Sequence, residues 1–510
     1  MSTAAEHSLA FAPAVPIGRS PRLLLVAYNF PPVGGAGVQR PVKWVKNLRQ
    51  FGWDVTVLTT ENPSVPARDE SLLADIPDDV LVIRARTWEP DYQTKQGLVA
   101  SSNSQSLSIV SRIGSALKGV VKQAVKFSLQ PDPQVLWVPN AVQAGRRILR
   151  ELSHDAILVT APAYSSFFIG TSLKRQFGLP LVLDFRDEWD LSGRYLENAQ
   201  RDPFSQFVQD RMQRYVLKRA DAVVATTKAS TANLAEKLAR LKKNETRATT
   251  IYNGFDADEF GSKHNLGSDL TIDERVPTNQ QHRPALAKST QPLLCHSPVG
   301  EGAIGVSHLP SQTTFRLLYT GTLWNLTTIE PLISAILRLN DKQPELVSKL
   351  ELVCVGRKTA EQTAILERVR STGCRLELVD YCDHAKVLDW LRSTNAVCLL
   401  LSDVAGAERV VPAKLFEYLA NRKEMLAIVP SGETADIVRS FYPEGPIEPK
   451  NVDGIVDWLR YRLAGEGIAT TDCLATADIH EYSRTTQTRR LAELLTELIQ
   501  ERYSQRRDAR

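Results

Sequence analysis

A cation and a carboxylate stand three positions apart in the C-terminal half of the chain, between two apolar runs. Lys414 and Glu417 share one face if the residues around them form a helix. The apolar runs, residues 396–401 and 425–429, have the composition of buried strands. In open α/β sheets, ligands bind at the carboxyl ends of the strands. A lysine there suits a phosphate and a carboxylate suits a pair of ribose hydroxyls, so the sequence predicts a nucleoside-diphosphate site.

A glycine-rich turn follows the first apolar run, residues 23–27. Two prolines stop that run, and Gly34, Gly35 and Gly37 precede a helical pattern that has Pro41 in its first turn. Glycines let backbone N–H groups approach a ligand, and a helix N-terminus favours an anion. The spacing matches neither the dinucleotide fingerprint nor the P-loop. We expect an anion to lie against Gly34 and Gly35, and a tight turn without a ligand is the alternative.

A charged segment, residues 184–190, follows the apolar run at residues 181–183. It places five charged residues around two aromatic ones, with Arg186 and Asp187 at its centre. Such a segment at a strand's carboxyl end can hold a polar substrate by hydrogen bonds and a stacked ring. The alternative is a capped loop in which an arginine and an aspartate form an ion pair.

Two weaker signals lie in the second half of the chain. Gly321 belongs to a turn of small residues after the apolar run at residues 315–319, and Arg357 and Lys358 follow the run at residues 350–355. Cations at the end of a strand can face a phosphate or can simply belong to a solvated loop. We expect Gly321 and Arg357 to take part in donor binding.

The elements that must position these residues alternate along the chain. Short apolar runs alternate with amphipathic segments of helical length, from residue 22 to about 252 and again from residue 315 onward. This alternation is typical of βαβ units and parallel sheets. Two such series predict an α/β protein with two doubly wound domains.

The predicted domain organisation has five parts. Residues 261–313 are rich in Pro, Ser, Gln, Thr and His and have no apolar period, which indicates a disordered linker. The predicted parts are a flexible leader (1–20), an N-terminal acceptor domain (21–260), the linker (261–313), a C-terminal donor-binding domain (314–480) and a closing helix with a basic tail (481–510).

Composition excludes several classes of protein. The net charge of +4 is too small to indicate nucleic-acid binding. No apolar run approaches the roughly 20 residues that a membrane span needs, and the N-terminus lacks the basic start and apolar core of a signal peptide. Six scattered cysteines without a C-x-x-C pair favour a reducing cytoplasm.

Residues 107–129, which we call the basic amphipathic segment, differ from the motifs above in suggesting contact with a membrane surface. Their apolar residues recur at helical spacing, and their polar positions include Arg112, Lys118, Lys122 and Lys126 but no acidic residue. A helix with a cationic polar face suits the surface of an anionic bilayer. The alternative is a helix packed on its own domain with the lysines in water.

Four motifs in one order resemble the glycosyltransferases of the GT-B fold, family 4, and within it a retaining subgroup of bacterial envelope-polysaccharide enzymes. The resemblance covers nearly the whole chain outside the leader and linker. The motifs are Tyr-Asn-Phe-Pro-Pro-Val-Gly-Gly (28–35), Asp-Phe-Arg-Asp-Glu-Trp (184–189), Asn-Gly-Phe-Asp (253–256) and Pro-Ala-Lys-Leu-Phe-Glu-Tyr-Leu-Ala (412–420).

The resemblance implies two facing Rossmann-like domains, with a nucleotide-sugar donor held mainly by the C-terminal one and an acceptor held by the other. Glu417 resembles the family glutamate that accepts the ribose hydroxyls, and Lys414 stands where a cation would meet the donor phosphates. Gly34 and Gly35 resemble the turn that approaches the diphosphate. The resemblance also implies retention, no bound metal or other cofactor, and a polysaccharide or lipid-linked acceptor at the inner face of the plasma membrane.

The sequence departs from the family pattern at two places. The family often has two glutamates separated by seven residues, and position 409, where the first is expected, is Arg409. Glu408 is therefore the candidate for the residue that touches the donor sugar. Many relatives carry a histidine in the loop where Arg186 stands, so Arg186 and Asp187 are the candidates for orienting acceptor or phosphate. These departures keep open two alternatives: a catalytically silent nucleotide-sugar-binding or scaffold protein, and a sugar-nucleotide epimerase.

Overall fold

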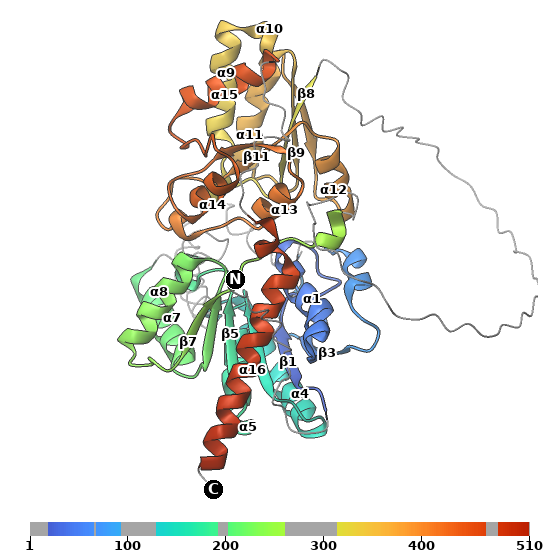
Figure 1. The fold of residues 1–510 in the computed structure, drawn as a ribbon, viewed down its shortest axis with the longest axis vertical. Helices are drawn as coiled ribbons and strands as arrows, with labels where there is room; N and C mark the ends of the chain where they lie inside the picture. Colours follow the sequence, from blue (N-terminus) through green and yellow to red (C-terminus); the bar gives the residue numbers. More distant parts are fainter. Residues whose placement is uncertain are drawn as a thin grey trace, which may run out of the picture.

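The computed structural model describes residues 19–65, 68–92, 129–191, 202–260, 314–465 and 478–508. These residues form two layered α/β units, stacked along the long axis of the molecule (Figure 1). The predicted linker, almost all of the predicted leader and residues 107–128 of the basic amphipathic segment lie outside the described residues.

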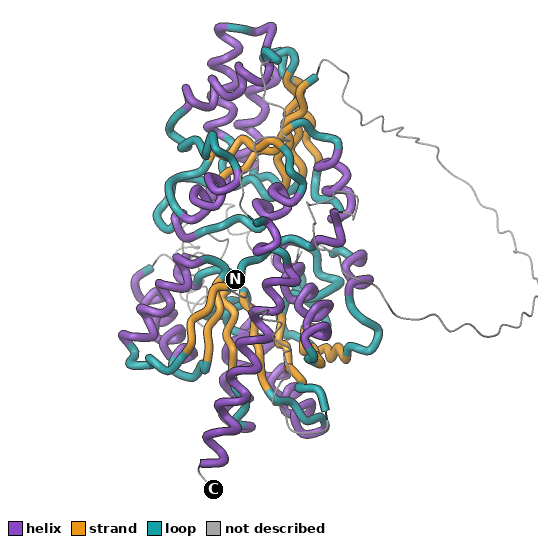
Figure 2. Tube along the Cα trace, viewed as in Figure 1, coloured by secondary structure: helices purple, strands orange, loops and turns teal. Residues whose placement is uncertain are grey.

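The first unit is built around a seven-stranded parallel sheet with the order β3-β2-β1-β4-β5-β6-β7. Helices cover both faces of this sheet (Figure 2). The strands are β1 (Arg22–Ala27), β2 (Asp54–Thr60), β3 (Leu81–Ala85), β4 (Ala156–Ala161), β5 (Leu181–Phe185), β6 (Ala222–Ala225) and β7 (Arg247–Thr250). The helices are α1 (Ala36–Leu48), α4 (Val138–Glu151), α5 (Ser166–Phe177), α7 (Pro203–Leu217) and α8 (Lys228–Arg240).

Continuous apolar runs form the central strands because both faces of a parallel sheet are covered. Successive residues of β1 point to opposite faces, so Leu24 joins the core beneath α4 and α5, while Leu23 joins the core beneath α1. Both leucines are fully buried. The strand order reverses between β1 and β4, which creates a crevice at the carboxyl edge of the sheet.

The second unit has a five-stranded parallel sheet with the order β10-β9-β8-β11-β12. Its order reverses between β8 and β11. The strands are β8 (Phe315–Thr320), β9 (Leu350–Val355), β10 (Arg375–Val379), β11 (Ala396–Leu400) and β12 (Glu424–Ile428). The helices are α9 (Glu330–Lys342), α10 (Pro344–Val347), α11 (Ala360–Glu367), α12 (His384–Arg392), α13 (Lys414–Ala420), α14 (Glu433–Phe441) and α15 (Val452–Leu463).

Helix α16 (Arg484–Asp508) leaves the second unit and runs along the first (Figure 1). Its leucines 491 and 495 are fully buried in the same core as Leu23, and Thr496 accepts a hydrogen bond from the Trp53 indole at 3.4 Å. The sequence pattern predicted a helix over residues 485–499 and a basic tail beyond it. Instead the helix continues through the arginine-rich end to Asp508.

The two parallel sheets with helices on both faces confirm the predicted α/β class of two doubly wound units.

Candidate active site

The crevice of the second sheet brings Gly321 and Lys414 together. Gly321 follows β8, and Lys414 begins α13 after β11, so the two residues lie on either side of the point where the strand order reverses. Gly321 has φ of 110°, and a Cβ atom at this position would lie 2.8 Å from Lys414 Nζ. The turn therefore needs glycine for its backbone conformation and for its contact with the ammonium group. Crevices of this kind hold ligands in α/β proteins.

The Lys414 side chain has an unusual electrostatic environment. Its Nζ lies 3.9 Å from the centroid of the buried Tyr319 ring. Burial lowers the pKa of Lys414 to about 7, because an ammonium that loses its hydration favours the neutral form. Within the described part of the chain, no carboxylate forms an ion pair with it. An anion in this crevice would supply the missing countercharge.

Glu417 lies one helical turn after Lys414 and faces α16. Its side chain is 13% exposed, and its Oε1 lies 3.8 Å from Nη2 of Arg484, a long ion pair. Arg484 also donates from Nη1 to the amide oxygen of Gln39 in α1 at 3.3 Å. The carboxylate therefore lies at the junction of the two units.

A histidine that the sequence pattern did not reveal lies near this carboxylate. His384 Nε2 lies 3.1 Å from the carboxylate of Glu259, one residue before the end of the described range 202–260. Burial alone would lower the pKa of His384, but the hydrogen bond to Glu259 and the charge of Glu417 raise it. The same contact lowers the pKa of Glu259 to about 2, although burial acts in the opposite direction.

The glycine turn of the first unit contacts the second unit through Tyr381, which follows β10. The Gly35 backbone N–H donates to the Tyr381 hydroxyl at 3.0 Å, and a Cβ atom on Gly34 would lie 2.7 Å from the same oxygen. Tyr381 is 39% exposed. The turn of the first unit therefore contacts the second unit through this hydroxyl, and anion binding by Gly34 and Gly35 stays a prediction.

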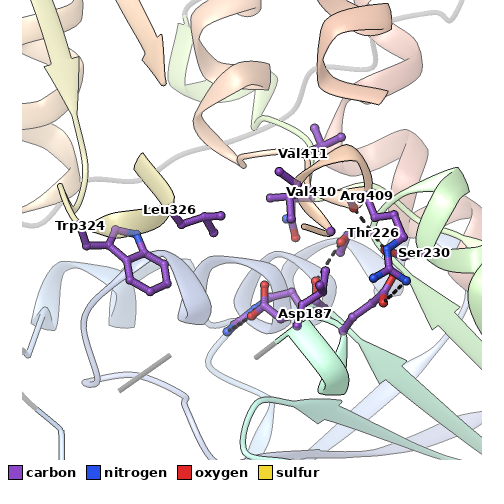
Figure 3. Close-up of a pocket in the computed structure, with 14 residues that line it drawn as sticks. Asp187, Thr226, Ser230, Trp324, Leu326, Arg409, Val410 and Val411 are labelled. Carbon is purple, nitrogen blue, oxygen red and sulfur yellow. Dashed lines mark hydrogen bonds and ion pairs between the residues drawn. The ribbon is translucent and has the colours of Figure 1, made fainter. Parts of the chain in front are cut away.

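Arg186 and Asp187 line a cavity of about 140 Å³ between the two units. Trp324 and Leu326 lie across this cavity from Arg409 and Ser230 (Figure 3). The cavity thus offers an apolar wall from the second unit and hydrogen-bonding groups from both units. This combination suits a molecule with both hydroxyl groups and apolar ring faces.

The loop that precedes α13 is held against the first unit. Arg409 Nη1 lies 3.0 Å from the buried carboxylate of Glu188, and the Arg409 carbonyl accepts hydrogen bonds from Thr227 and Ser230. The Glu408 carboxylate accepts the N–H of Gly406, a residue that lines the cavity, at 2.9 Å, and the Glu408 side chain is 56% exposed. Arg409 and Gly406 line the cavity, and a contact of Glu408 with the donor sugar stays a prediction.

The two cations after β9 behave differently from each other. Lys358 donates to the carbonyl oxygens of Gly356 and Val379, each at 2.6 Å. Arg357 has an exposed side chain. The Lys358 ammonium is therefore held by backbone carbonyl groups, and a role of Arg357 in donor binding stays a prediction.

The predicted site residues thus fall into three groups. Gly321, Lys414 and Glu417 lie along one crevice of the second unit, and Arg186 and Asp187 line the cavity between the units. The others lie apart: Gly34 and Gly35 meet Tyr381, Glu408 turns toward Gly406, and Arg357 is exposed after β9.

Several contacts at the junction were not predicted from the sequence. Glu433 of α14 accepts the backbone N–H groups of Lys228 and Ala229, both at 2.9 Å, at the N-terminus of α8. It also accepts the Tyr252 hydroxyl at 2.6 Å. A carboxylate at a helix N-terminus complements the helix dipole, so this residue fastens one unit to the other. In the sequence, only the position of Glu433 at the start of a helical pattern could have indicated this role.

The first unit's crevice contains a buried ion pair that sequence reasoning also missed. Arg40 of α1 pairs with Asp184 at the end of β5 through two hydrogen bonds, at 2.9 and 3.2 Å, and both side chains are at most 3% exposed. Asp184 also accepts the Thr160 hydroxyl at 2.7 Å. Asp184 therefore has a structural role, and Arg186 and Asp187 are left to face the cavity.

The described residues include neither a metal cluster nor a membrane span. No group of three or more metal-binding side chains is found among them. None of the helices described here has the length and apolar character to cross a bilayer.

Comparisons with known proteins agree with this architecture. Residues 34–254 match the family model of the glycosyl transferase 4-like domain. None of the curated proteins matches the sequence. The solved structure of HepE from Anabaena in complex with UDP and glucose has a TM-score of 0.55 and 13% identity, covering 94% of this chain and 100% of that one. The fold is GT-B.

Two further solved structures are similar. A glycosyltransferase from Rickettsia africae has a TM-score of 0.52 and 13% identity, covering 94% of this chain and 99% of that one. The N-terminal domain of a Candida albicans trehalose-6-phosphate phosphatase has a TM-score of 0.51 and 12% identity, covering 95% and 94%. At these identities the similarity establishes the GT-B fold of the chain and nothing about its substrates.

Proposed function

We propose that the protein is a glycosyltransferase that takes a sugar from a nucleoside-diphosphate sugar. One observation carries the proposal: a lysine without a carboxylate partner in the described structure lies against a glycine turn in the crevice of the second GT-B unit, with a carboxylate one turn further along the same helix. The lysine can bind a phosphate and the carboxylate can bind a ribose, in the order in which these groups follow each other in a sugar nucleotide. The family match over residues 34–254 and the Anabaena complex with UDP and glucose support it.

The proposed roles follow from position and charge. Lys414 would neutralise the departing diphosphate, helped by the backbone N–H of Gly35 once Tyr381 moves away from it. Glu417 would accept the ribose hydroxyls. The reacting sugar and the acceptor would meet in the cavity lined by Arg186 and Asp187, where exclusion of water favours transfer over hydrolysis.

Retention of anomeric configuration, a polysaccharide or lipid-linked acceptor, and a cytoplasmic location on the inner face of the membrane are parts of the same proposal. Their support is the resemblance of four sequence motifs to envelope-polysaccharide enzymes. The proposal includes no metal and no other cofactor, since positive charge at the diphosphate would come from the lysine and from backbone N–H groups.

A nucleotide-sugar-binding protein without turnover is the second candidate. The observation that favours it is the ion pair between Arg409 and Glu188, which joins the two units across the cavity. If this pair held the units fixed, an acceptor could not enter. Binding of a diphosphate without any release of sugar would support this candidate.

The first experiment is thermal unfolding of the purified protein with UDP, GDP, ADP, TDP or CMP. A ligand at 100 times its Kd stabilises a protein by about 2.7 kcal/mol, which shifts the unfolding midpoint visibly. We expect a shift with one diphosphate that Glu417→Ala abolishes and that Glu361→Ala, which removes an exposed carboxylate of α11, leaves intact. No shift with any nucleotide would contradict the proposed donor site. The matching sugar nucleotide, incubated with membrane extracts, then distinguishes transfer from binding alone.

A further inference from the structure

Helix α7 exposes a row of large aromatic side chains. Phe204 and Phe207 are 60% and 58% exposed, and Tyr215 is 40% exposed. With Arg211 they occupy positions i, i+3, i+7 and i+11, which lie on one side of a helix. We call these four residues the outer face of α7. Two phenylalanines this exposed on one face are unusual for a surface that contacts only water.

A groove adjoins this face. It has a volume of about 440 Å³ and is lined almost entirely by apolar groups. Phe168 of α5 forms its far wall, with its ring centroid 6.0 Å from that of Tyr215. The residues that line it are Phe168, Phe207, Val208, Arg211, Met212 and Tyr215.

The helix itself is firmly held, so the exposure does not come from a detached segment. On its inner side Gln209 accepts the Trp189 indole N–H at 3.0 Å, and Gln213 accepts from Lys237 at 3.0 Å. Val216 and Leu217 are buried in the core of the first unit. The outer face is therefore presented on a rigid element.

Positive charge surrounds the aromatic rings. The guanidinium of Arg211 lies over the Phe207 ring at 5.8 Å, and that of Arg219 lies over the Tyr215 ring at 3.6 Å. Arg214 and Lys218 add two more cations on the same stretch, and Asp210, paired with Arg214, is the only acidic residue within the helix. Arginine and lysine stems can cover apolar surface while their charges reach an anionic layer.

We propose that the outer face of α7 and its groove dock on an anionic lipid bilayer, with the phenylalanines entering the boundary between headgroups and acyl chains. The aromatic and apolar surface suits that boundary, and the surrounding cations suit acidic headgroups. The inference deepens the membrane location that the proposed function includes, but its evidence is the surface of α7 and not the transfer reaction.

The sequence of the basic amphipathic segment favours a bilayer over an intramolecular cover. That segment ends beside α7, since the Gln130 side chain donates to Ser205 in the first turn of the helix at 2.8 Å. The segment carries Lys118, Lys122 and Lys126 and no acidic residue. Packing it on α7 would bring like charges together, whereas an anionic bilayer attracts both.

The test is flotation of the full chain with vesicles of phosphatidylcholine, with and without one third phosphatidylglycerol. We expect binding to the anionic vesicles only, and weaker binding at 0.5 M than at 0.1 M NaCl, because salt screens the headgroup charge. The double variant Phe204→Ser/Phe207→Ser should bind at least about tenfold more weakly, because each substitution removes apolar area that the bilayer would otherwise bury. Tyr461→Ser removes an aromatic ring that is 38% exposed on the second unit, away from α7, and should bind normally.

Three results would overturn the inference. The first is that the full chain binds neither kind of vesicle. The second is that the double phenylalanine variant binds as well as the parent while Lys118→Gln/Lys122→Gln/Lys126→Gln does not, which would assign docking to the basic segment alone. The third is a clearly lowered unfolding midpoint of the phenylalanine variant without vesicles, which would show that another part of the chain covers these rings.

Discussion

The half-buried ammonium of Lys414 leads to a prediction about pH. In the ligand-free protein the pKa of Lys414 is about 7, whereas a lysine in the unfolded chain has a pKa of about 10.4. A diphosphate beside the amine would favour its charged form and restore the higher pKa. Binding must then draw a proton from solution at any pH between these two values.

The magnitude follows from the protonated fraction. From pH 7 to pH 9 the protonated fraction of an amine with a pKa of about 7 falls from roughly one half to roughly one hundredth. If only the charged amine binds the diphosphate, its Kd should rise about 50-fold over this range. The terminal phosphate has its last pKa near 6, so its own charge changes little above pH 7.

Isothermal titration calorimetry with the diphosphate at pH 8, in two buffers of different ionisation enthalpy, measures the proton uptake directly. We expect about 0.9 proton per ligand, because a group with a pKa of about 7 is about nine-tenths deprotonated at this pH. Lys414→Met should bind more weakly, with a Kd that no longer depends on pH. Lys423→Met is the control. Burial lowers the pKa of the Lys423 amine as well, but this residue directly precedes β12 and therefore lies at the amino ends of the strands, away from the crevice.

The same shift affects the stability of the ligand-free fold. Below pH 7 the lysine is charged in both states, so the full cost of burying the ammonium is present. Between about pH 7 and pH 10 only the unfolded chain keeps the proton, so stability should rise with pH, by at most about 1.4 kcal/mol per unit.

A Kd of the diphosphate that stays constant from pH 7 to pH 9, together with no proton uptake at pH 8, would refute the reasoning.

Three further predictions concern the junction and the crevice. Gly321→Ala and Gly465→Ala both place a side chain at positive φ, so each should lower the free energy of unfolding by about 1–3 kcal/mol. Only Gly321→Ala crowds the ammonium of Lys414, so only this variant should weaken diphosphate binding in titrations. Glu433→Gln removes the negative charge from the N-terminus of α8 and should lower the stability in urea by about 1 kcal/mol; an unchanged midpoint would mean that the units are held elsewhere. His384→Asn should destabilise the protein more at pH 6 than at pH 8.5, because a raised folded pKa gives stability that is complete below about 6.5 and is lost as pH rises through the folded value. Equal losses at both pH values would show that the contact of His384 with Glu259 does not depend on its charge.

The fold could be predicted from the sequence because its evidence is local. A strand buried on both faces must be apolar throughout, and residues 23–27 and 396–401 show this directly. The helix at the end of the chain was predicted only where its leucines keep a helical period. Its last turns contain arginines without that period, so their helical structure could not be recognised from the pattern.

The site was predictable only within each unit. Lys414 and Gly321 could be proposed as neighbours of a ligand because each follows a strand, and parallel strands end at a common edge. The contact of Gly35 with Tyr381 joins residues 346 positions apart, and the contact of Arg409 with the first unit is similarly distant. Such pairs depend on how the two units face each other, and no local pattern encodes that arrangement. The chemical roles of the predicted residues stay predictions.

The route of α16 has a consequence for synthesis on the ribosome. The helix completes the core around Leu23, yet it is made some 230 residues after the last strand of the first sheet. At about 5–20 residues per second, that apolar face waits for roughly 10 to 50 seconds. During this time a chaperone must shield the apolar face, because otherwise the face is exposed to aggregation. A premature stop codon just before residue 484 would therefore damage the first unit, although every residue of its own sheet had been made.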